Sequence, residues 1–140
     1  MLVNNNFSKT VDLLHRGMSA ASLRQSVIAD NLSNATTPNF RRTDVNFEAE
    51  LNRALDTEKH RPALELRLTH PMHMSNWDPR DYQEVQPRRV LDYLSQTDNN
   101  GNNVDMEEEF NLLLKNQLRY LLLAQMATHE FSQLNMILRG

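Results

Sequence analysis

The sequence contains no cysteine, and it has only three glycines and one tryptophan. The absence of cysteine excludes disulfide bonds, thiolate metal sites and thiol chemistry. Long hydrophobic runs are also missing, because the most apolar window, residues 112–123, includes Lys115 and Arg119. It is too short and too polar to span a bilayer. The N-terminal residues lack the charged start, apolar core and cleavage site of a secretory signal, so an exported protein would need another route.

Charge and motif content argue against several classes of activity. Fifteen basic and eighteen acidic side chains give a formal charge of −3, without the basic face that binding to nucleic acid requires. We find no glycine-rich phosphate loop, nucleophile elbow or acid–base pair. We therefore expect no enzyme, no small-molecule substrate, no cofactor and no nucleic-acid partner.

The apolar residues, 39 % of the chain, are unevenly distributed. They concentrate in residues 7–32 and 104–138, whereas residues 33–103 are rich in Asn, Asp, Arg, Pro and Thr. Such a middle segment buries too little apolar surface to offset its chain entropy, so we expect it to be irregular or weakly β, or to depend on a partner.

Both apolar segments carry a heptad pattern, with steps of four and three residues, and neither contains an internal proline. We therefore predict a mainly α fold in which N- and C-terminal helices pair as an antiparallel coiled coil, with Phe7 near Leu138. The predicted parts are a first helix in 1–33, a turn and irregular middle in 34–103, and a second helix in 104–140. The seam positions are Phe7, Val11, Leu14, Met18, Ala21, Gln25, Ile28 and Leu32, and Met106, Phe110, Leu113, Gln117, Tyr120, Ala124, Ala127, Phe131, Leu134 and Leu138.

Two glutamines, Gln25 and Gln117, interrupt these seams. A buried amide in an apolar seam costs stability but can fix the register of the two helices. Alternatively, each side chain reaches out to water.

The second helix carries more leucines than one seam can cover, since Leu112, Leu114, Leu118, Leu121, Leu122 and Leu123 project outside the main stripe. We infer that neighbouring subunits cover them, although the middle segment of the same chain could also fold over this surface. The predicted assembly interface consists of Leu14, Met18, Ile28, Leu112, Leu114, Leu118, Leu121, Leu122, Phe131 and Leu134.

The segment Ile28-Ala-Asp-Asn-Leu-Ser-Asn-Ala-Thr-Thr-Pro-Asn-Phe40 combines a helix stop with a tight turn. Pro38 pushes Thr37 towards an extended conformation, and Asn39 suits a turn position with positive φ. The segment resembles the signature of flagellar rod, hook and filament-axis proteins, Asn-(Ile/Leu)-(Ala/Ser)-Asn-x-x-Thr-x-Gly-(Phe/Tyr). The residues of this turn motif are Asn31, Leu32, Ser33, Asn34, Thr37, Pro38, Asn39 and Phe40, with Asn39 where the family usually has glycine.

A second motif, Asp98-Asn-Asn-Gly-Asn-Asn-Val-Asp-Met-Glu-Glu-Glu109, precedes the second helix. Asp105 and Glu108 have the spacing of a helix N-cap and its reciprocal acid. The run resembles the Asp-Gly-Asn-Asn-Val-Asp-x-x-x-Glu segment that opens the C-terminal helix in FlgB-like and FlgC-like rod proteins. The residues of this helix-start motif are Asn102, Asn103, Val104, Asp105 and Glu108.

Together with Pro38 and the short length, the two motifs are similar to those of the FlgB family of proximal rod proteins. The resemblance implies a structural subunit of the flagellar basal-body rod that polymerises through its terminal helices, transmits torque from the motor ring to the distal rod and hook, and is required for motility. It implies a place in the rod crossing the periplasm and export without a cleaved signal peptide. Implied partners are other copies of the chain, sister rod proteins, a FliE-type adaptor and the flagellar export apparatus.

Other interpretations of single features are weaker. An EF-hand loop around Gly101 would need Gln96 as its first ligand, which is a poor choice. His70 and His73 offer a metal only two imidazoles at a non-helical spacing, and Trp77 with Tyr82 looks more like an interface anchor than a nucleotide platform. A soluble coiled-coil hairpin that acts as an adaptor or regulator explains the heptads equally well, but not the two motifs.

Overall fold

A computed structural model of the chain describes residues 6–59, 67, 69–70, 72–74, 80–95 and 101–139. These residues form two compact units. The first, which we call the helical unit, comprises the described residues up to Val45 and from Arg89 onwards. The second, the middle unit, lies between Asn46 and Arg88.

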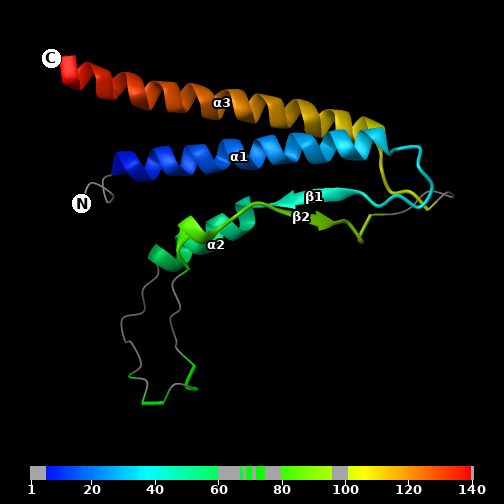
Figure 1. Cartoon of the computed structure of the whole chain (residues 1–140), viewed down its shortest axis with the longest axis horizontal. Coiled ribbons are helices and arrows are strands. Elements are labelled where there is room, and N and C mark those ends of the chain that lie inside the picture. Colours follow the sequence, from blue (N-terminus) through cyan, green and yellow to red (C-terminus); the bar gives the residue numbers. More distant parts are fainter. Residues whose placement is uncertain are drawn as a thin grey trace. The chain divides into compact units, whose positions relative to one another are not determined.

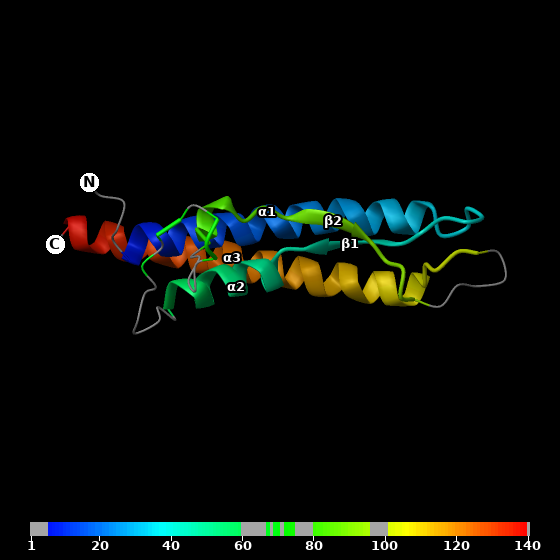
Figure 2. The same ribbon diagram turned by 90° about the horizontal axis from the view of Figure 1, so that it is seen from below.

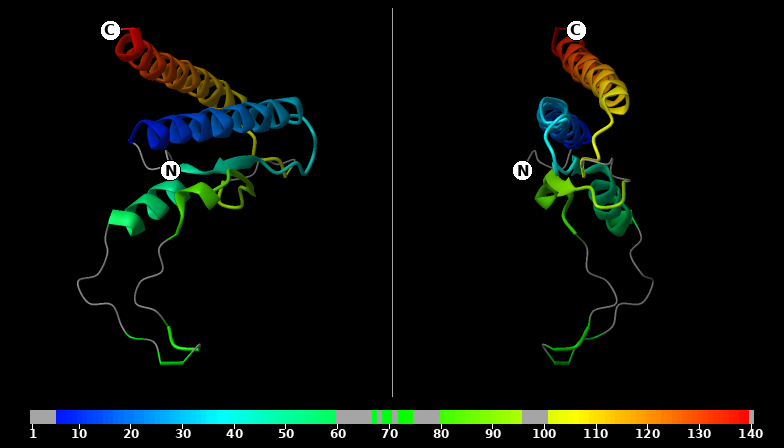
Figure 3. Two further views of the ribbon diagram at one scale, coloured as in Figure 1. Left: turned by 60° about the vertical axis from the view of Figure 1, so that its left-hand side comes forward. Right: turned by 90° about the vertical axis from the view of Figure 1, so that its right-hand side faces the viewer.

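The helical unit is built on two long helices. Helix α1 spans Asn6–Ser33 and helix α3 spans Met106–Arg139, and the two lie side by side in opposite directions (Figure 1). The predicted mainly α class with paired terminal helices is therefore confirmed. The helices lie closest where α1 ends and α3 begins, and they separate towards the chain termini (Figures 1 and 3).

Contacts between the helices define their register. The rings of Phe7 and Phe131 meet edge to face with centroids 6.0 Å apart, and the side-chain amide of Asn116 donates to the carbonyl oxygen of Ala21 at 2.8 Å. The expectation that Phe7 lies near Leu138 was wrong by one heptad. Gly17 allows the close approach, because a Cβ atom there would lie 3.2 Å from Cδ1 of Leu123.

The face that α3 turns towards α1 also differs from the predicted seam. Glu109 and Asn116 are its buried residues, whereas Met106, Phe110 and Gln117 are exposed. Leucines occur on so many sides of α3 that its apolar periodicity leaves the rotation of the helix undecided. Hydrogen bonds of Glu109 and Asn116 to other elements select one rotation.

On α1, the predicted seam is closer to the observed one. Leu14, Ala21 and Ile28 are buried, together with Ala20 and Val27 beside them. Gln25 is exposed, as is Gln117 on α3, so both glutamines reach water and neither fixes the register.

A two-stranded sheet follows α1. Strand β1 spans Thr43–Asn46 and strand β2 spans Arg88–Leu91, and their arrows point in opposite directions (Figure 1). Side chains of α1 bind this sheet, since Arg24 Nη2 donates to the Val45 carbonyl oxygen at 3.3 Å and Arg89 forms an ion pair with Asp30 at 3.1 Å. Figure 2 shows the helices and the sheet from below.

The middle unit contains a helix that the sequence analysis did not predict. Helix α2 spans Glu48–Lys59, with acidic residues in its first turn and Lys59 in its last, as the helix dipole favours. The short 3₁₀ helix η1 spans Tyr82–Glu84 and is capped by Asp81. The ion pair between Arg80 and Glu50, at 3.4 Å, links the chain before η1 to α2.

None of the helices in the described part of the chain is both long enough and apolar enough to cross a membrane.

Candidate functional site

The turn motif caps the end of α1. The N–H of Asn34 donates to the carbonyl oxygen of Asp30 at 3.2 Å, and the N–H of Thr37 donates to the carbonyl oxygen of Asn34 at 2.9 Å. A third turn closes where the N–H of Phe40 donates to the carbonyl oxygen of Thr37 at 3.3 Å. Asn39, at the position after Pro38, has φ of 60°. Proline followed by a residue with positive φ is the pattern of a type II turn.

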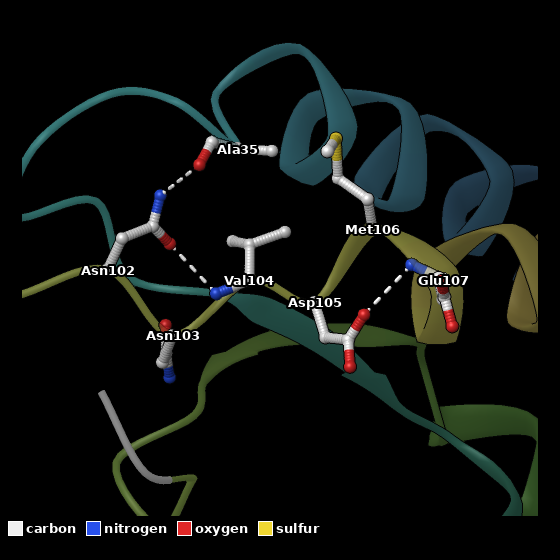
Figure 4. Close-up of a pocket in the computed structure, with 7 residues that line it drawn as sticks. All are labelled: Ala35, Asn102, Asn103, Val104, Asp105, Met106 and Glu107. Atoms are coloured by element: carbon white, nitrogen blue, oxygen red, sulfur yellow. Dashed lines mark hydrogen bonds between the residues drawn. The ribbon is translucent and has the colours of Figure 1, made fainter. Parts of the chain in front are cut away.

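Asn102 from the helix-start motif binds the turn motif across the fold. Its side-chain nitrogen donates to the carbonyl oxygens of Ala35 at 2.6 Å, Thr37 at 3.3 Å and Asn34 at 3.4 Å. Its side-chain oxygen accepts from the N–H of Val104 at 2.8 Å (Figure 4). Asn102 is buried, and its amide holds the backbone carbonyl groups of the turn that follows α1. The two motifs are therefore parts of one joint.

Gly101 is positioned where this joint leaves no room for a side chain. It has φ of 76°, which favours glycine, and a Cβ atom there would lie 2.6 Å from the side-chain oxygen of Asn39. The residue with positive φ in one motif thus lies directly against the residue with positive φ in the other.

A second layer of polar contacts lies beside the joint, and we call it the polar clasp: Asn31, Arg42, Asp92, Asn103 and Glu109. The side-chain oxygen of Asn103 accepts from the N–H of Arg42 at 2.6 Å, and its nitrogen donates to the carbonyl oxygen of Asp92 at 3.0 Å. The side-chain amide of Asn31 pairs with the backbone of Thr43 through two hydrogen bonds of 2.8 and 3.0 Å. The polar clasp thus connects α1, the chain beside β1 and β2, and the start of α3.

The charged members of the polar clasp are Arg42, Glu109 and Asp92. The side chain of Glu109 is completely buried, and its Oε1 accepts from Nε of Arg42 at 2.5 Å. Arg42 also pairs with Asp92 at 3.3 Å. Burial alone would lower the pKa of Arg42, but its hydrogen bond and charge contact with Glu109 raise the pKa above its ordinary value. The guanidinium therefore stays charged inside the polar clasp.

Asp92 holds a tight turn at residues 92–95. Its carboxylate accepts from the N–H of Leu94 at 2.9 Å, from the N–H of Ser95 at 3.1 Å and from the Ser95 hydroxyl. These hydrogen bonds, that of the Ser95 hydroxyl first, lower the pKa of Asp92 from 3.8 to about 2.

The start of α3 is capped by Asp105. One side-chain oxygen of Asp105 accepts from the N–H of Glu107 at 2.8 Å (Figure 4). The same oxygen accepts from the N–H of Glu108 at 3.3 Å. An open pocket lies here, lined by Ala35, residues 102–105, Met106 and Glu107. The hydrogen bonds drawn in it belong to the joint and to the cap, so we assign the pocket a structural role.

The outward side of α3 carries exposed leucines, which are opposite to the face that contacts α1. We call this set the outer stripe. Leu118, at its centre, is 58 % exposed. Further along α3, Met136, Ile137 and Leu138 are also exposed. The outer stripe consists of Phe110, Leu114, Leu118, Leu121 and Leu122.

Comparison with known proteins identifies the family. The family model described as "Flagella basal body rod protein" matches residues 14–41, which include the turn motif. The protein named "Flagellar basal body rod protein FlgB" in Borreliella burgdorferi is 42 % identical over 135 residues, which are 96 % of this chain and 99 % of the relative. Proteins of the same name in Borrelia hermsii and Bacillus subtilis are 43 % and 31 % identical, over 96 % of this chain in both cases and over 99 % and 96 % of the relatives.

The chain belongs to the FlgB family of flagellar basal body rod proteins. It is therefore a component of the flagellar basal body rod, and a member of a family of structural proteins.

The predicted interface residues of this FlgB-family chain fall into two groups. Leu14 and Ile28 are buried within the helical unit, and Met18 and Leu112 are partly covered. These four are therefore available to a neighbour only in part or not at all. The others are exposed: Leu114, Leu118, Leu121, Leu122, Phe131 and Leu134.

The structure describes some of the residues behind the metal, EF-hand and interface-anchor interpretations. The rings of His70 and His73 lie 5.7 Å apart, and among the described residues no three histidine, aspartate or glutamate side chains are grouped around a common point. Trp77 lies outside the described residues, as do Gln96, Asp98 and Asn100 of the EF-hand alternative. Tyr82 begins the 3₁₀ helix of the middle unit.

Sequence analysis missed the charged part of the polar clasp and the buried Asn116. One signal was available in the family pattern of the helix-start motif. Its final glutamate comes four residues after the aspartate that matches Asp105, so it corresponds to Glu109 and not to the capping candidate Glu108. Asn116, a polar residue within the leucine-rich stretch of α3, was a second signal. Arg42 and Asp92 gave none, since their partners lie far away in the sequence.

Proposed function

We propose that this FlgB-family chain is a structural subunit of the proximal rod that polymerises through its terminal helices and has no catalytic activity. In the assembled rod it transmits torque from the motor ring to the distal rod and hook, and cells require it for motility. Its partners are other copies of itself, sister rod proteins, the FliE-type adaptor at the rod base and the export apparatus. The rod crosses the periplasm, and the subunit reaches it without a cleaved signal peptide.

The outer stripe of α3 is the observation that supports polymerisation. An exposed row of large apolar side chains on one helix is typical of a protein–protein interface. At about 25 cal/mol for each Å² of apolar surface removed from water, covering several leucines supplies a substantial driving force for association. The joint and the polar clasp support the mechanical role, because they tie the chain that follows α1 to the start of α3 through hydrogen bonds of buried side chains.

We further propose that neighbouring subunits, and not the middle segment of the same chain, cover the outer stripe. We also propose that the chain is divided by role into a first helix in 1–33, a middle segment in 34–103 and a second helix in 104–140. In this division the two helices make the rod contacts, and the middle segment does not.

The test replaces Leu118 by Asp in the chromosomal copy. A carboxylate in the outer stripe should abolish rod assembly and motility while the protein is still produced and exported. The matched variant Lys115→Asp places the same side chain at an exposed polar position of α3 and should leave motility intact. Motile cells with complete rods in the Leu118→Asp strain would refute the role of the outer stripe.

A further inference from the structure

A turn in the middle unit brings two histidine side chains together. The N–H of His73 donates to the carbonyl oxygen of His70 at 3.0 Å, and the N–H of Met72 donates to Nδ1 of the His70 ring at 3.2 Å. The centres of the two imidazole rings are 5.7 Å apart. His70 and His73 are both exposed, so neither imidazole is part of a packed core.

The spacing of the two rings allows both to bind the same ion. A metal–nitrogen bond to histidine is about 2.0–2.1 Å long, so a bound ion lies roughly 3.2 Å from the centre of each ring. Two rings on one ion then have centres at most about 6.4 Å apart. The observed 5.7 Å fits a bent arrangement of the two ligands. Because Nδ1 of His70 accepts the N–H of Met72, this nitrogen carries a lone pair, and an ion bound there would replace that N–H.

Met72 and Met74 add two thioether sulfurs to the same turn. The two side chains are 84 % and 90 % exposed, so neither sulfur is enclosed by apolar neighbours. Methionine has a flexible side chain and a polarizable sulfur, which lets it adapt to a ligand. We call this set the His/Met cluster, and it consists of His70, Met72, His73 and Met74.

The types of donor in the His/Met cluster identify the class of ion. Thioethers select Cu⁺, whereas imidazole suits copper and zinc alike. A zinc site is usually completed by further histidine, cysteine or carboxylate ligands. In the part of the chain that the structure describes, no group of three histidine, aspartate or glutamate side chains could hold a metal ion. Copper in its +1 state is therefore the ion that the imidazoles and the thioethers have in common.

We propose that the His/Met cluster binds a soft monovalent cation, Cu⁺, through its two imidazoles and its two thioethers. The site is separate from the rod contacts proposed above, because it lies in the middle unit and none of its residues belongs to α1 or α3. Binding of the ion therefore requires no polymerisation.

A titration of the purified full chain with Ag⁺ tests the site. Ag⁺ has the charge and the soft character of Cu⁺ and keeps its oxidation state in air, and the chain has no cysteine that would compete for it. NMR signals of the methyl groups of Met72 and Met74 and of the rings of His70 and His73 should shift together. The methyl signals of the methionines on α3 should not shift at the same concentration of Ag⁺.

Two variants measure what each kind of donor contributes. Met72→Leu with Met74→Leu should weaken the binding of Ag⁺ on the order of tenfold, because it leaves only the two imidazoles. His70→Gln with His73→Gln should weaken it by a similar factor.

The matched control is Met106→Leu with Met136→Leu, which removes two exposed methionines of α3 and should bind Ag⁺ like the parent. Far-UV circular dichroism of the variants in the His/Met cluster should equal that of the parent, since all four side chains are exposed.

Three outcomes would overturn the proposal. The first is that Ag⁺ does not bind, and the second is equal affinity for Ag⁺ in the parent and in Met72→Leu with Met74→Leu. The third is that Zn²⁺ binds as tightly as Ag⁺, which would indicate a site for imidazole ligands alone. None of these outcomes affects the proposed function, because that function is tested by rod assembly in the Leu118→Asp strain.

Discussion

At the residue scale, the buried pair of Arg42 and Glu109 determines how the start of α3 is held. Glu109 has no solvent exposure, and its Oε2 atom has no hydrogen-bond partner among the described residues. A buried ion pair is weak support for stability as such, because each charge loses its hydration. The buried ion pair instead makes any arrangement unfavourable in which Arg42 or Glu109 is buried without the opposite charge.

We therefore expect Glu109→Ala to destabilise the folded chain by roughly 3 kcal/mol, because it removes the main counter-charge of the buried Arg42 guanidinium and leaves only Asp44 and Asp92 near it. Replacing both partners, by Arg42→Met with Glu109→Leu, should cost less than the single change. The exposed Glu108→Gln should cost less than about 1 kcal/mol. Urea unfolding followed by circular dichroism measures all three, and equal losses for Glu109→Ala and Glu108→Gln would contradict the assigned role.

Asp92 makes the stability of the chain depend on pH. Its pKa is lowered to about 2 in the folded chain from an ordinary 3.8, so folding favours its ionised form. The resulting stabilisation is complete above about pH 4 and is lost as the pH falls from about 4 to about 2. Asp92→Asn should flatten the dependence of the unfolding free energy on pH in this window, and Ser95→Ala should shift the Asp92 titration, followed by NMR, towards 3.8. An unchanged Asp92 titration in Ser95→Ala would show that the turn does not cause the shift.

At the element scale, the sequence predicted where the terminal helices lie but not how they face each other. The heptads, Pro38 and Asp105 are local signals, and local signals suffice to place α1 and the start of α3. The rotation of α3 depends instead on Glu109 and Asn116, whose partners Arg42 and Ala21 are distant in sequence. The joint was predictable as two motifs, but their contact through Asn102 was not.

Asn116 is a buried amide between the helices, so we expect it to fix the register, the role that the sequence offered for Gln25 and Gln117. It is 3 % exposed, and among the described residues its Oδ1 has no hydrogen-bond partner although its nitrogen donates to Ala21. Asn116→Leu should therefore stabilise the hairpin by about 1 kcal/mol while weakening the choice of register.

Disulfide trapping measures this choice. The parent should cross-link only the pair Phe7→Cys with Phe131→Cys, whereas Asn116→Leu should also permit Phe7→Cys with Leu138→Cys, one heptad away. Gln117→Ala, at the exposed neighbouring position, should behave like the parent. A single register in Asn116→Leu would mean that the joint alone fixes the helices.

At the scale of the whole molecule, the subunit combines polar groups that bind one another within the chain with apolar surface on α3 that stays exposed. Helices gain most of their stability from tertiary packing, and the outer half of α3 has little of it within the described chain. We therefore expect the isolated chain at low concentration to be only partly helical, and its helicity to rise with concentration as copies cover the outer stripe. Leu118→Asp should remove this concentration dependence, and Lys115→Asp should retain it. Circular dichroism with sedimentation over the same concentration range makes the measurement, and a dilute monomer that melts cooperatively from full helicity would show that the helices need no neighbour.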